Sequence, residues 1–232
     1  GTLQGVDAAP DSLLADEQPV GIDGERLVLS TVGMFYDTRD DEIHPTRGAT
    51  FDLAGYGSAP WLGSSYGYSG AHAAVRGFAS PNPSTVVAGH ALIEASSPGE
   101  PFFQASELNG LSYGSVGGRD LLRGLGEERL RGPGVAAVQA ELRWTFWRPV
   151  IFEDLELDFM LVPFVDAARV LTWDEPRPFV LDPHVTGGGG LRINIEALLV
   201  LRADVGVGVE RYVTAPVRRP QVQVYLLAEH PF

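Results

Sequence analysis

The sequence contains no cysteine and no lysine, so all 17 of its basic residues are arginine. The missing thiols exclude disulfides, thiolate metal sites and a cysteine nucleophile. The missing ammonium groups exclude a phosphate-binding loop of the G-x-x-x-x-G-K type, a Schiff-base lysine and an S-x-x-K acyl-enzyme. These absences remove particular classes of site, and we also expect no catalytic residues, no enzymatic activity, no cofactor and no metal site in this chain.

Long hydrophobic runs are also missing. No stretch of 18 apolar residues exists, so the sequence predicts no transmembrane helix. The chain opens without a signal peptide, and Gly1 is expected to be a processed or truncated end. The net charge of −13 has the wrong sign for nucleic acid, which is excluded as a partner. Transmembrane β-strands stay compatible with this composition, because their alternating signal is weak in a hydropathy scan.

Glycine and proline are abundant, at 28 and 17 residues, and they separate short apolar stretches. That pattern predicts many strands joined by turns. Residues 1–25 are acidic and without periodicity, and we expect a leader or linker there. Residues 26–232 are expected to form about nine strands, four before and five after a glycine-rich loop at about 96–134. The expected strands cover residues 27–36, 50–56, 66–78, 86–95, 135–146, 157–167, 191–196, 199–210 and 221–226.

The strands after the loop alternate cleanly between apolar and polar residues. In 135–146, for example, Leu142 and Trp144 share one face, and Glu141 and Arg143 share the other. Such alternation fits any antiparallel sheet with one wet face, including a soluble β-sandwich that buries the apolar residues. Runs of about 10 to 13 residues match a tilted bilayer crossing, and polar faces rich in opposite charges suit a hydrated lumen. We therefore predict an all-β, antiparallel transmembrane β-barrel.

Residues 117–126, GGRDLLRGLG, resemble a motif of the BamA-like superfamily of outer-membrane insertases and transporters, the bacterial surface antigen family. Members carry a long loop with a V/I-R-G-F/Y motif that folds back into the barrel lumen. The corresponding residues here are Leu122, Arg123, Gly124 and Leu125, with leucine in place of the usual aromatic residue.

Further motifs follow in the order that the family shows. Glu141 lies in the strand after the loop, and the next strand holds Phe164 and Asp166 in a version of F-x-D-x-G that has Ala168 in place of glycine. Upstream, YDTRDDEIHPTRG at 36–48 resembles a strand-turn segment of the family. The chain ends on Phe232, which resembles a C-terminal assembly signal, although His230 departs from the apolar pattern.

The resemblance implies a bacterial outer-membrane protein that takes part in inserting proteins into the outer membrane or transporting them across it. It could act through a weak seam between first and last strands or through a conducting lumen. The alternative is a barrel that serves only as a membrane anchor or structural subunit, for instance for an enzyme domain outside this chain. Expected partners are outer-membrane lipid and substrate outer-membrane proteins.

Full-length relatives have about sixteen strands, and bacterial single-chain barrels are generally even-numbered. The expected nine strands are therefore part of a larger barrel. The remaining strands are expected in sequence N-terminal to Gly1, on another chain or on a second copy.

Physical reasoning supports the same loop contact. Alternation places Glu141 and Asp166 on inward faces of adjacent strands, and a guanidinium can serve two carboxylates through its fork of donors. Gly124 would let the loop backbone come close to the wall. We expect Arg123 to pin the loop structurally by bonding to Asp166 or Glu141, rather than to perform chemistry. The alternative is that these residues are ordinary lumen charges.

Four other patterns are weaker candidates. A literal G-x-S-x-G at 63–67 lacks the helix that a nucleophile elbow needs, and chance explains it better. His72 and His90 share a polar face with Arg76 and Glu94, and lumen-lining residues are favoured over an acid–base pair. The acids at 37–42 lack the order of a calcium loop and predict a solvated turn. Gly187–Gly190 predicts a flexible barrel turn.

Overall fold

The computed structural model describes residues 2–4, 18–105, 107–109, 114–130, 132–151, 155–172, 183–195, 199–212 and 215–229. Its main feature is one antiparallel sheet in the order β14-β13-β12-β11-β9-β6-β5-β4-β3, with β10 paired to β11 alone. The strands of the ordered path are β3 (Ser30–Asp37), β4 (Gly48–Ser58), β5 (Tyr68–Asn82), β6 (Thr85–Ser96), β9 (Gly134–Trp147), β11 (Leu155–Leu171), β12 (His184–Ile195), β13 (Leu199–Tyr212) and β14 (Ala215–Glu229). The predicted all-β antiparallel fold is confirmed.

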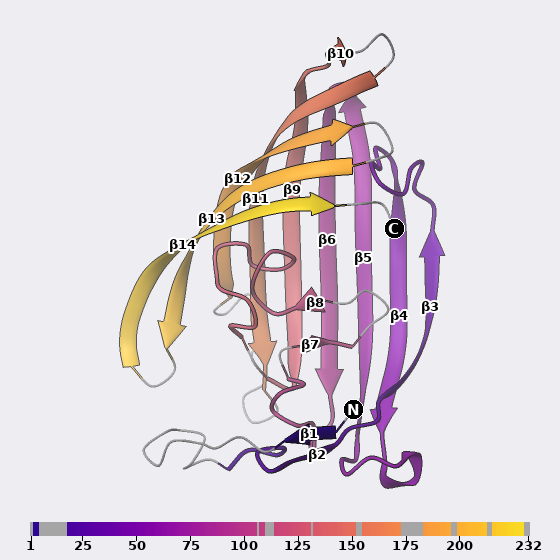
Figure 1. Ribbon diagram of the computed structural model, residues 1–232, viewed down its shortest axis with the longest axis vertical. Coiled ribbons are helices and arrows are strands. Elements are labelled where there is room, and N and C mark those ends of the chain that lie inside the picture. The colour runs from indigo at the N-terminus through magenta and orange to yellow at the C-terminus, as the bar shows by residue number, and fades with distance from the viewer. Residues whose placement is uncertain are drawn as a thin grey trace.

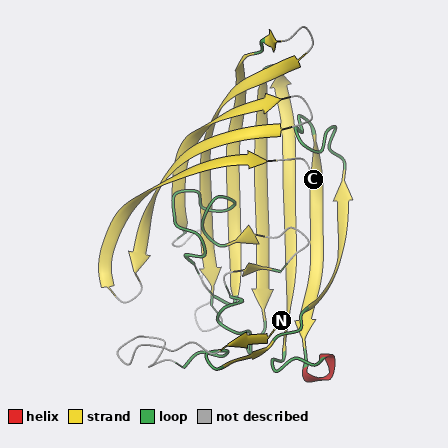
Figure 2. Ribbon diagram, in the orientation of Figure 1, coloured by secondary structure: helices red, strands yellow, loops and turns green. Residues whose placement is uncertain are grey.

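The sheet is strongly curved, and the connection between β6 and β9 lies against its concave face (Figure 1). Neighbours in sequence are neighbours in the sheet, except that β7 (Glu107–Leu108) and β8 (Gly114–Ser115) leave it and pair with each other. In the described part of the chain the single helical element is a short 3-10 turn, Pro60–Leu62 (Figure 2). No helix among the described residues is long and apolar enough to cross a membrane.

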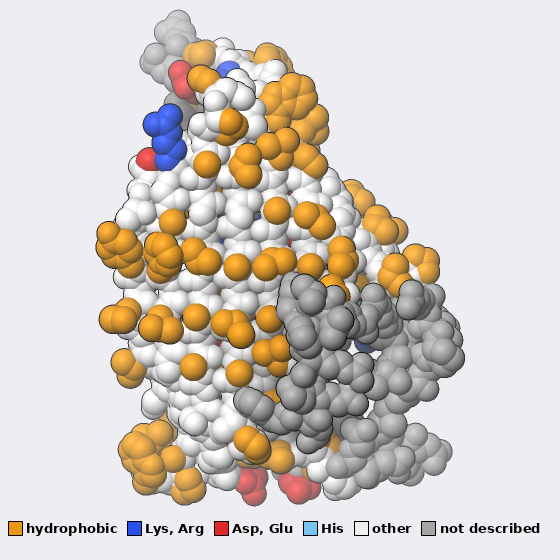
Figure 3. Space-filling view, turned by 180° about the vertical axis from the view of Figure 1, so that it is seen from behind, with side chains coloured by type: hydrophobic (Ala, Val, Ile, Leu, Met, Phe, Trp, Pro, Cys, Tyr) orange, Lys and Arg blue, Asp and Glu red, His pale blue; other side chains and the backbone are white. Residues whose placement is uncertain are grey.

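The convex face of the sheet carries exposed hydrophobic side chains from every strand of the path. In β12 these side chains lie on either side of the glycine run. Val138 is 44% exposed and Val207 is 49% exposed, although both lie well inside long strands. Figure 3 shows these side chains in rows across the strands, with the charged groups of this face near its ends. A β-sandwich would bury this face under a second sheet, and none of the described residues forms one. The sandwich alternative is therefore wrong.

The concave face is where the protein buries its polar groups. Asp166 and Asp204 are fully buried, and His72 and Glu94 are nearly so. An apolar cluster lies on the same face, where Leu121, Leu122 and Leu125 of the β6–β9 connection pack against strand residues such as Leu92 and Val135. The connection therefore supplies much of the packing on the inner side of the sheet.

One expectation about the strands is wrong. Gly187–Gly190 is not a turn but the middle of β12, which begins at His184. The glycines are needed where strands and side chains approach closely. A Cβ on Gly188 would collide with the Val205 carbonyl, and one on Gly190 would collide with the Asp204 carboxylate. Because glycine is otherwise rare inside strands, the run imitates a turn in the sequence.

The described ends of the acidic segment 1–25 are in contact with the rest of the protein. β1 (Thr2–Gln4) pairs with β2 (Gly24–Arg26). The Phe102 amide donates to the Val20 carbonyl at 2.9 Å, and the Ser65 amide donates to the Arg26 carbonyl at 2.8 Å. β1 and β2 lie at the end of the sheet where the β6–β9 connection starts (Figure 1).

The two outermost strands of the path, β3 and β14, each have one neighbour among the described residues. Nine strands that are antiparallel throughout place β3 and β14 parallel to each other, so they cannot close the sheet with an antiparallel seam. Purified alone in detergent, the chain is expected not to form a closed monomeric barrel. Semi-native electrophoresis should show no heat-modifiable monomer, with the boiled sample as control. A faster-migrating monomer band before boiling would contradict the open sheet.

Candidate functional site

The connection between β6 and β9 folds back onto the concave face and forms the candidate site. Both of its ends are fixed together, because the Ser96 amide donates to the Pro133 carbonyl at 2.7 Å. Its inner part, residues 116–125, is almost wholly buried apart from Arg119 and Asp120. We call the described residues from 97 to 133 the inner loop.

Arg123 is the central contact of the inner loop. Its Nε donates to Asp166 Oδ2 at 3.0 Å and its Nη2 donates to Asp166 Oδ1 at 2.8 Å, which makes a two-pronged ion pair. Its Nη1 donates to Glu141 Oε2 at 3.0 Å, and its backbone amide also donates to Asp166. The guanidinium carbon lies 3.7 Å from the ring centre of Phe164. The structure thus brings together Arg123, Glu141, Phe164 and Asp166, which the sequence grouped.

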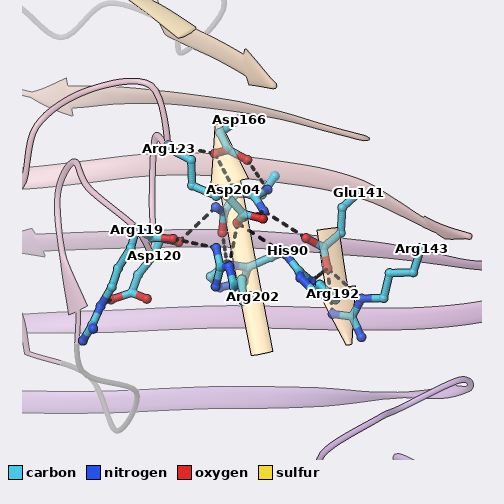
Figure 4. A network of polar contacts seen from close by, with 11 residues as sticks. His90, Arg119, Asp120, Arg123, Glu141, Arg143, Asp166, Arg192, Arg202 and Asp204 are labelled. Atoms are coloured by element: carbon cyan, nitrogen blue, oxygen red, sulfur yellow. Dashed lines mark hydrogen bonds and ion pairs between the residues drawn. The ribbon is translucent and has the colours of Figure 1, made fainter. Parts of the chain in front are cut away.

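A wider set of charges surrounds this contact (Figure 4). Asp204 of β13 lies 4.0 Å from Arg123 Nη1 and accepts from Arg202 Nε at 2.6 Å. On the other side, Glu141 accepts from Arg143 Nε at 2.7 Å and from Arg192 Nη1 at 3.3 Å. Alternation had already placed Glu141 and Arg143 on one face of their strand. It could not bring Arg192 of β12 to Glu141 of β9, because β11 lies between these strands in the sheet.

The leucines of the motif serve the apolar side of the same contact. Leu122 and Leu125 are fully buried in the cluster beneath the loop. Leu122 has a φ of 60°, an uncommon value for a residue with a side chain, and its carbonyl accepts from the Leu125 amide at 2.9 Å. The turn presents the Arg123 amide and side chain to one carboxylate.

Glycines make room for the loop on β13. A Cβ on Gly206 would overlap the Arg123 carbonyl, and one on Gly208 would meet the Gly124 carbonyl at 3.0 Å. A Cβ on Gly124 would likewise overlap the backbone of Val207. Only residues without side chains allow two backbones to approach this closely. The sequence reasoning anticipated this role for Gly124 and missed it for Gly206 and Gly208.

A second anchor holds the inner loop farther from the tip. The Glu94 carboxylate accepts from the Asn109 amide at 3.0 Å and from Asn109 Nδ2 at 3.0 Å. His72 Nδ1 lies 2.8 Å from Glu94 Oε2. His72 and Glu94 therefore share the inner face because they contact each other there. Through the bonds from Glu94 to Asn109, both residues have a structural role in holding the loop. A third tie runs to the last strand, where the Tyr225 hydroxyl donates to the Leu125 carbonyl at 2.9 Å.

The acidic residues at 37–42 are engaged within their own turn. Asp37 pairs with Arg39 at 2.7 Å, and Asp41 accepts from the Ile43 and His44 amides. Asp40 accepts from the Thr46 hydroxyl and from the Arg47 and Thr46 amides, and these bonds lower the pKa of Asp40 to about 2. The arrangement is the solvated turn that the sequence predicted. Among the described residues no group of three or more His, Asp and Glu side chains is arranged to hold a metal ion.

Two further candidates have no catalytic geometry. The G-x-S-x-G residues at 63–67 lead into strand β5, not into a helix, so Ser65 lacks the strand-to-helix turn of a nucleophile elbow. His90 Nδ1 faces Gln139 Oε1 at 2.8 Å rather than His72. The expected assembly signal at Phe232 lies outside the described residues.

Comparison with known proteins locates this fold. No family model matches the sequence, and no curated protein matches it. The chain is similar to the crystal structure of BamA from Haemophilus ducreyi lacking POTRA domains 1–3, with a TM-score of 0.61 and 17% sequence identity. The match covers 86% of this chain and 42% of the BamA chain, so the chain spans less than half of that protein. The fold is therefore similar to that of the BamA β-barrel, as the loop motif predicted.

Replacing Arg123 should release the inner loop. Arg123→Ala leaves Asp166 buried without its cation, and breaking a buried pair on one side costs roughly 3–5 kcal/mol. Arg123→Lys should rescue poorly, because an ammonium group cannot bridge both acids. Limited proteolysis within residues 117–134 should report the release. The control is Arg119→Ala, which removes an exposed arginine of the same loop. Equal protection of Arg123→Ala and the parent protein would contradict the docked loop.

A methyl group on β13 should displace the loop without changing any charge. Gly206→Ala places its Cβ against the Arg123 backbone, and overpacking of this kind costs roughly 1–3 kcal/mol. Gly187→Ala is the matched control, because its Cβ would meet nothing nearer than the Phe164 carbonyl at 3.6 Å. Proteolysis of the inner loop should accelerate in the first variant only. Similar cleavage rates in both variants would show that the close approach is unimportant.

Proposed function

We infer, from a fold shared with BamA-like outer-membrane β-barrels, that this chain is the C-terminal part of such a barrel and takes part in inserting proteins into the outer membrane or moving them across it. The observation that carries the proposal is the inner loop held by Arg123 on Asp166 and Glu141. We assign the chain no enzymatic role and no nucleic-acid partner.

Outer-membrane lipid is the proposed solvent of the convex face. Water would not favour so many exposed aliphatic and aromatic side chains in mid-strand, whereas the hydrocarbon core does. Trp144, Phe146 and Trp147 gather with Phe159 near one end of the strands, with ring centres as close as 4.8 Å. Aromatic girdles at the lipid–water interface have this character. The opposite face holds the buried charges, as suits a hydrated interior.

The proposed mechanism uses the last strand of the sheet. The outer edge of β14 has no partner among the described strands, and an unpaired edge offers backbone donors and acceptors to an incoming strand. The inner loop ties β9, β11 and β14 together through Glu141, Asp166 and Tyr225. A docked loop therefore sets the curvature of the strands that lead to this edge. In the complete barrel, the edge would form the seam that opens toward substrate outer-membrane proteins.

The absence of cysteine makes crosslinking a direct test, because a single introduced cysteine is the only thiol in this sequence. Val224→Cys lies on the lipid-facing side of edge strand β14, and Leu191→Cys lies on the same face of interior strand β12. The test is made in bacterial outer membranes that are assembling a barrel protein with a single cysteine. Crosslinked adducts between that protein and this chain are expected with Val224→Cys and not with Leu191→Cys.

Depletion of the protein should also lower the amount of folded outer-membrane barrels, measured by heat-modifiability of a resident porin. Unchanged porin levels together with no adduct at Val224→Cys would favour the alternative, a barrel that only anchors or supports a complex. Adducts at both positions would indicate nonspecific contact, which argues against a role for the edge.

A further inference from the structure

A cavity of about 430 Å³ opens on the concave face beside the tip of the inner loop. Its walls come from β5, β6, β9, β11, β12 and β13, and residues 43–46 border it at the end of the sheet away from the loop ends. It lies on the opposite side of the sheet from the apolar convex face. A dissolved molecule can therefore reach it from the inner side, and the sheet separates it from lipid headgroups.

The charge of the cavity is opposite to that of the chain. The protein carries a net charge of −13, yet seven of its 17 arginines line this space beside only three acids. The arginines are Arg76, Arg119, Arg123, Arg143, Arg148 and Arg192 together with Arg202, and the acids are Asp120, Glu141 and Asp158. Asp166 and Asp204 pair with Arg123 and Arg202 from behind this lining, so seven arginines meet five acids and the site keeps a positive excess. A concave site with low-dielectric walls focuses that excess.

Several donors in the cavity wall have hydrogen-bonding capacity to spare. The Arg76 guanidinium has no hydrogen-bond or ion-pair partner in the part of the chain that the structure describes, and the cross-strand neighbour of Arg76 on β6 is His90. Arg192 is 8% exposed, and its Nε lacks a hydrogen-bond partner among those residues. A buried cationic donor without a partner is costly, and an anion in the cavity would satisfy it.

The orientation of His90 follows from its neighbours. Gln139 Nε2 donates to the Asp120 carbonyl at 3.0 Å, so Gln139 Oε1 is the atom that faces His90 Nδ1 at 2.8 Å. An amide oxygen accepts, and Nδ1 therefore carries the proton. The other ring nitrogen, Nε2, is buried and without a partner in the described structure. On protonation, Nε2 becomes one more donor beside Arg76.

We propose that this cavity binds a soluble phosphate-bearing anion, with Arg76 and Arg192 as its principal contacts. The guanidinium group suits phosphate because its planar fork donates two parallel hydrogen bonds to two oxygens. The volume falls in the range of small-molecule sites, so the ligand is larger than inorganic phosphate, such as a diphosphate or a small phosphorylated molecule. This inference goes beyond the proposed function and depends only on the geometry of the inner face.

Pyrophosphate is the probe, titrated by calorimetry into the whole chain in an uncharged detergent. Binding is expected to saturate and to weaken as salt is raised. Arg76→Gln should weaken binding about tenfold or more, since a hydrogen bond to a charged group is lost. Arg26→Gln makes the same change of charge at the other end of the sheet, in β2, and should leave binding unchanged.

A second measurement needs no variant. Phenylglyoxal modifies arginine side chains, and pyrophosphate should protect Arg76 from it while leaving Arg26 reactive, as read by mass spectrometry. Absence of pyrophosphate binding, equal weakening by both variants, or equal protection of both arginines would each overturn the site. None of these three outcomes bears on insertion or transport, which the crosslinking experiment tests separately.

Discussion

The buried guanidinium of Arg123 is the constraint on which the inner face depends. A cation removed from water is very costly unless opposite charges and hydrogen bonds replace the lost hydration. Asp166 and Glu141 supply the charges, and the ring of Phe164 covers the planar face of the guanidinium. These three contacts together hold the loop in its position on the concave face. Gly206 and Gly208 are consequences of that fixed position, because the loop backbone must pass over β13 to deliver the arginine.

The distribution of polarity is reversed relative to a water-soluble sheet. Its outer surface is apolar, and its inner surface combines a leucine cluster with a network of ionised side chains. The charges tolerate burial because nearly all of them bond to one another. Glu94 shows the same logic at the second anchor, where one carboxylate serves both a histidine and the backbone of Asn109. The loop is thus held at its tip and near its start by the same kind of contact.

Much of the fold follows from alternation in the sequence. The strands after the loop were predicted well because Leu142, Trp144, Val205 and their neighbours repeat with period two. β12 was predicted too short, because its glycines serve contacts with Val205 and Asp204 that only the assembled sheet reveals. Arg123, Glu141 and Asp166 were identified by motif and parity. Arg192 was not, because its contact with Glu141 crosses from β12 to β9, which are not paired in the sheet. Alternation put Arg202 and Asp204 on one face of β13, but it did not show that Asp204 would lie near Arg123 of the loop.

The parity of the strand path limits how a complete barrel can be built. β3 and β14 run in the same direction along the sheet. A second copy inserted in the same direction would present edges that also point that way, so every junction between the two copies would be parallel. Antiparallel junctions would require the second copy to cross the bilayer upside down, with its loops on the wrong side. A two-fold axis along the membrane normal is therefore incompatible with a closed antiparallel wall. A set of strands that closed such a wall would be odd in number, and its two outer members would run in the opposite direction to β3 and β14.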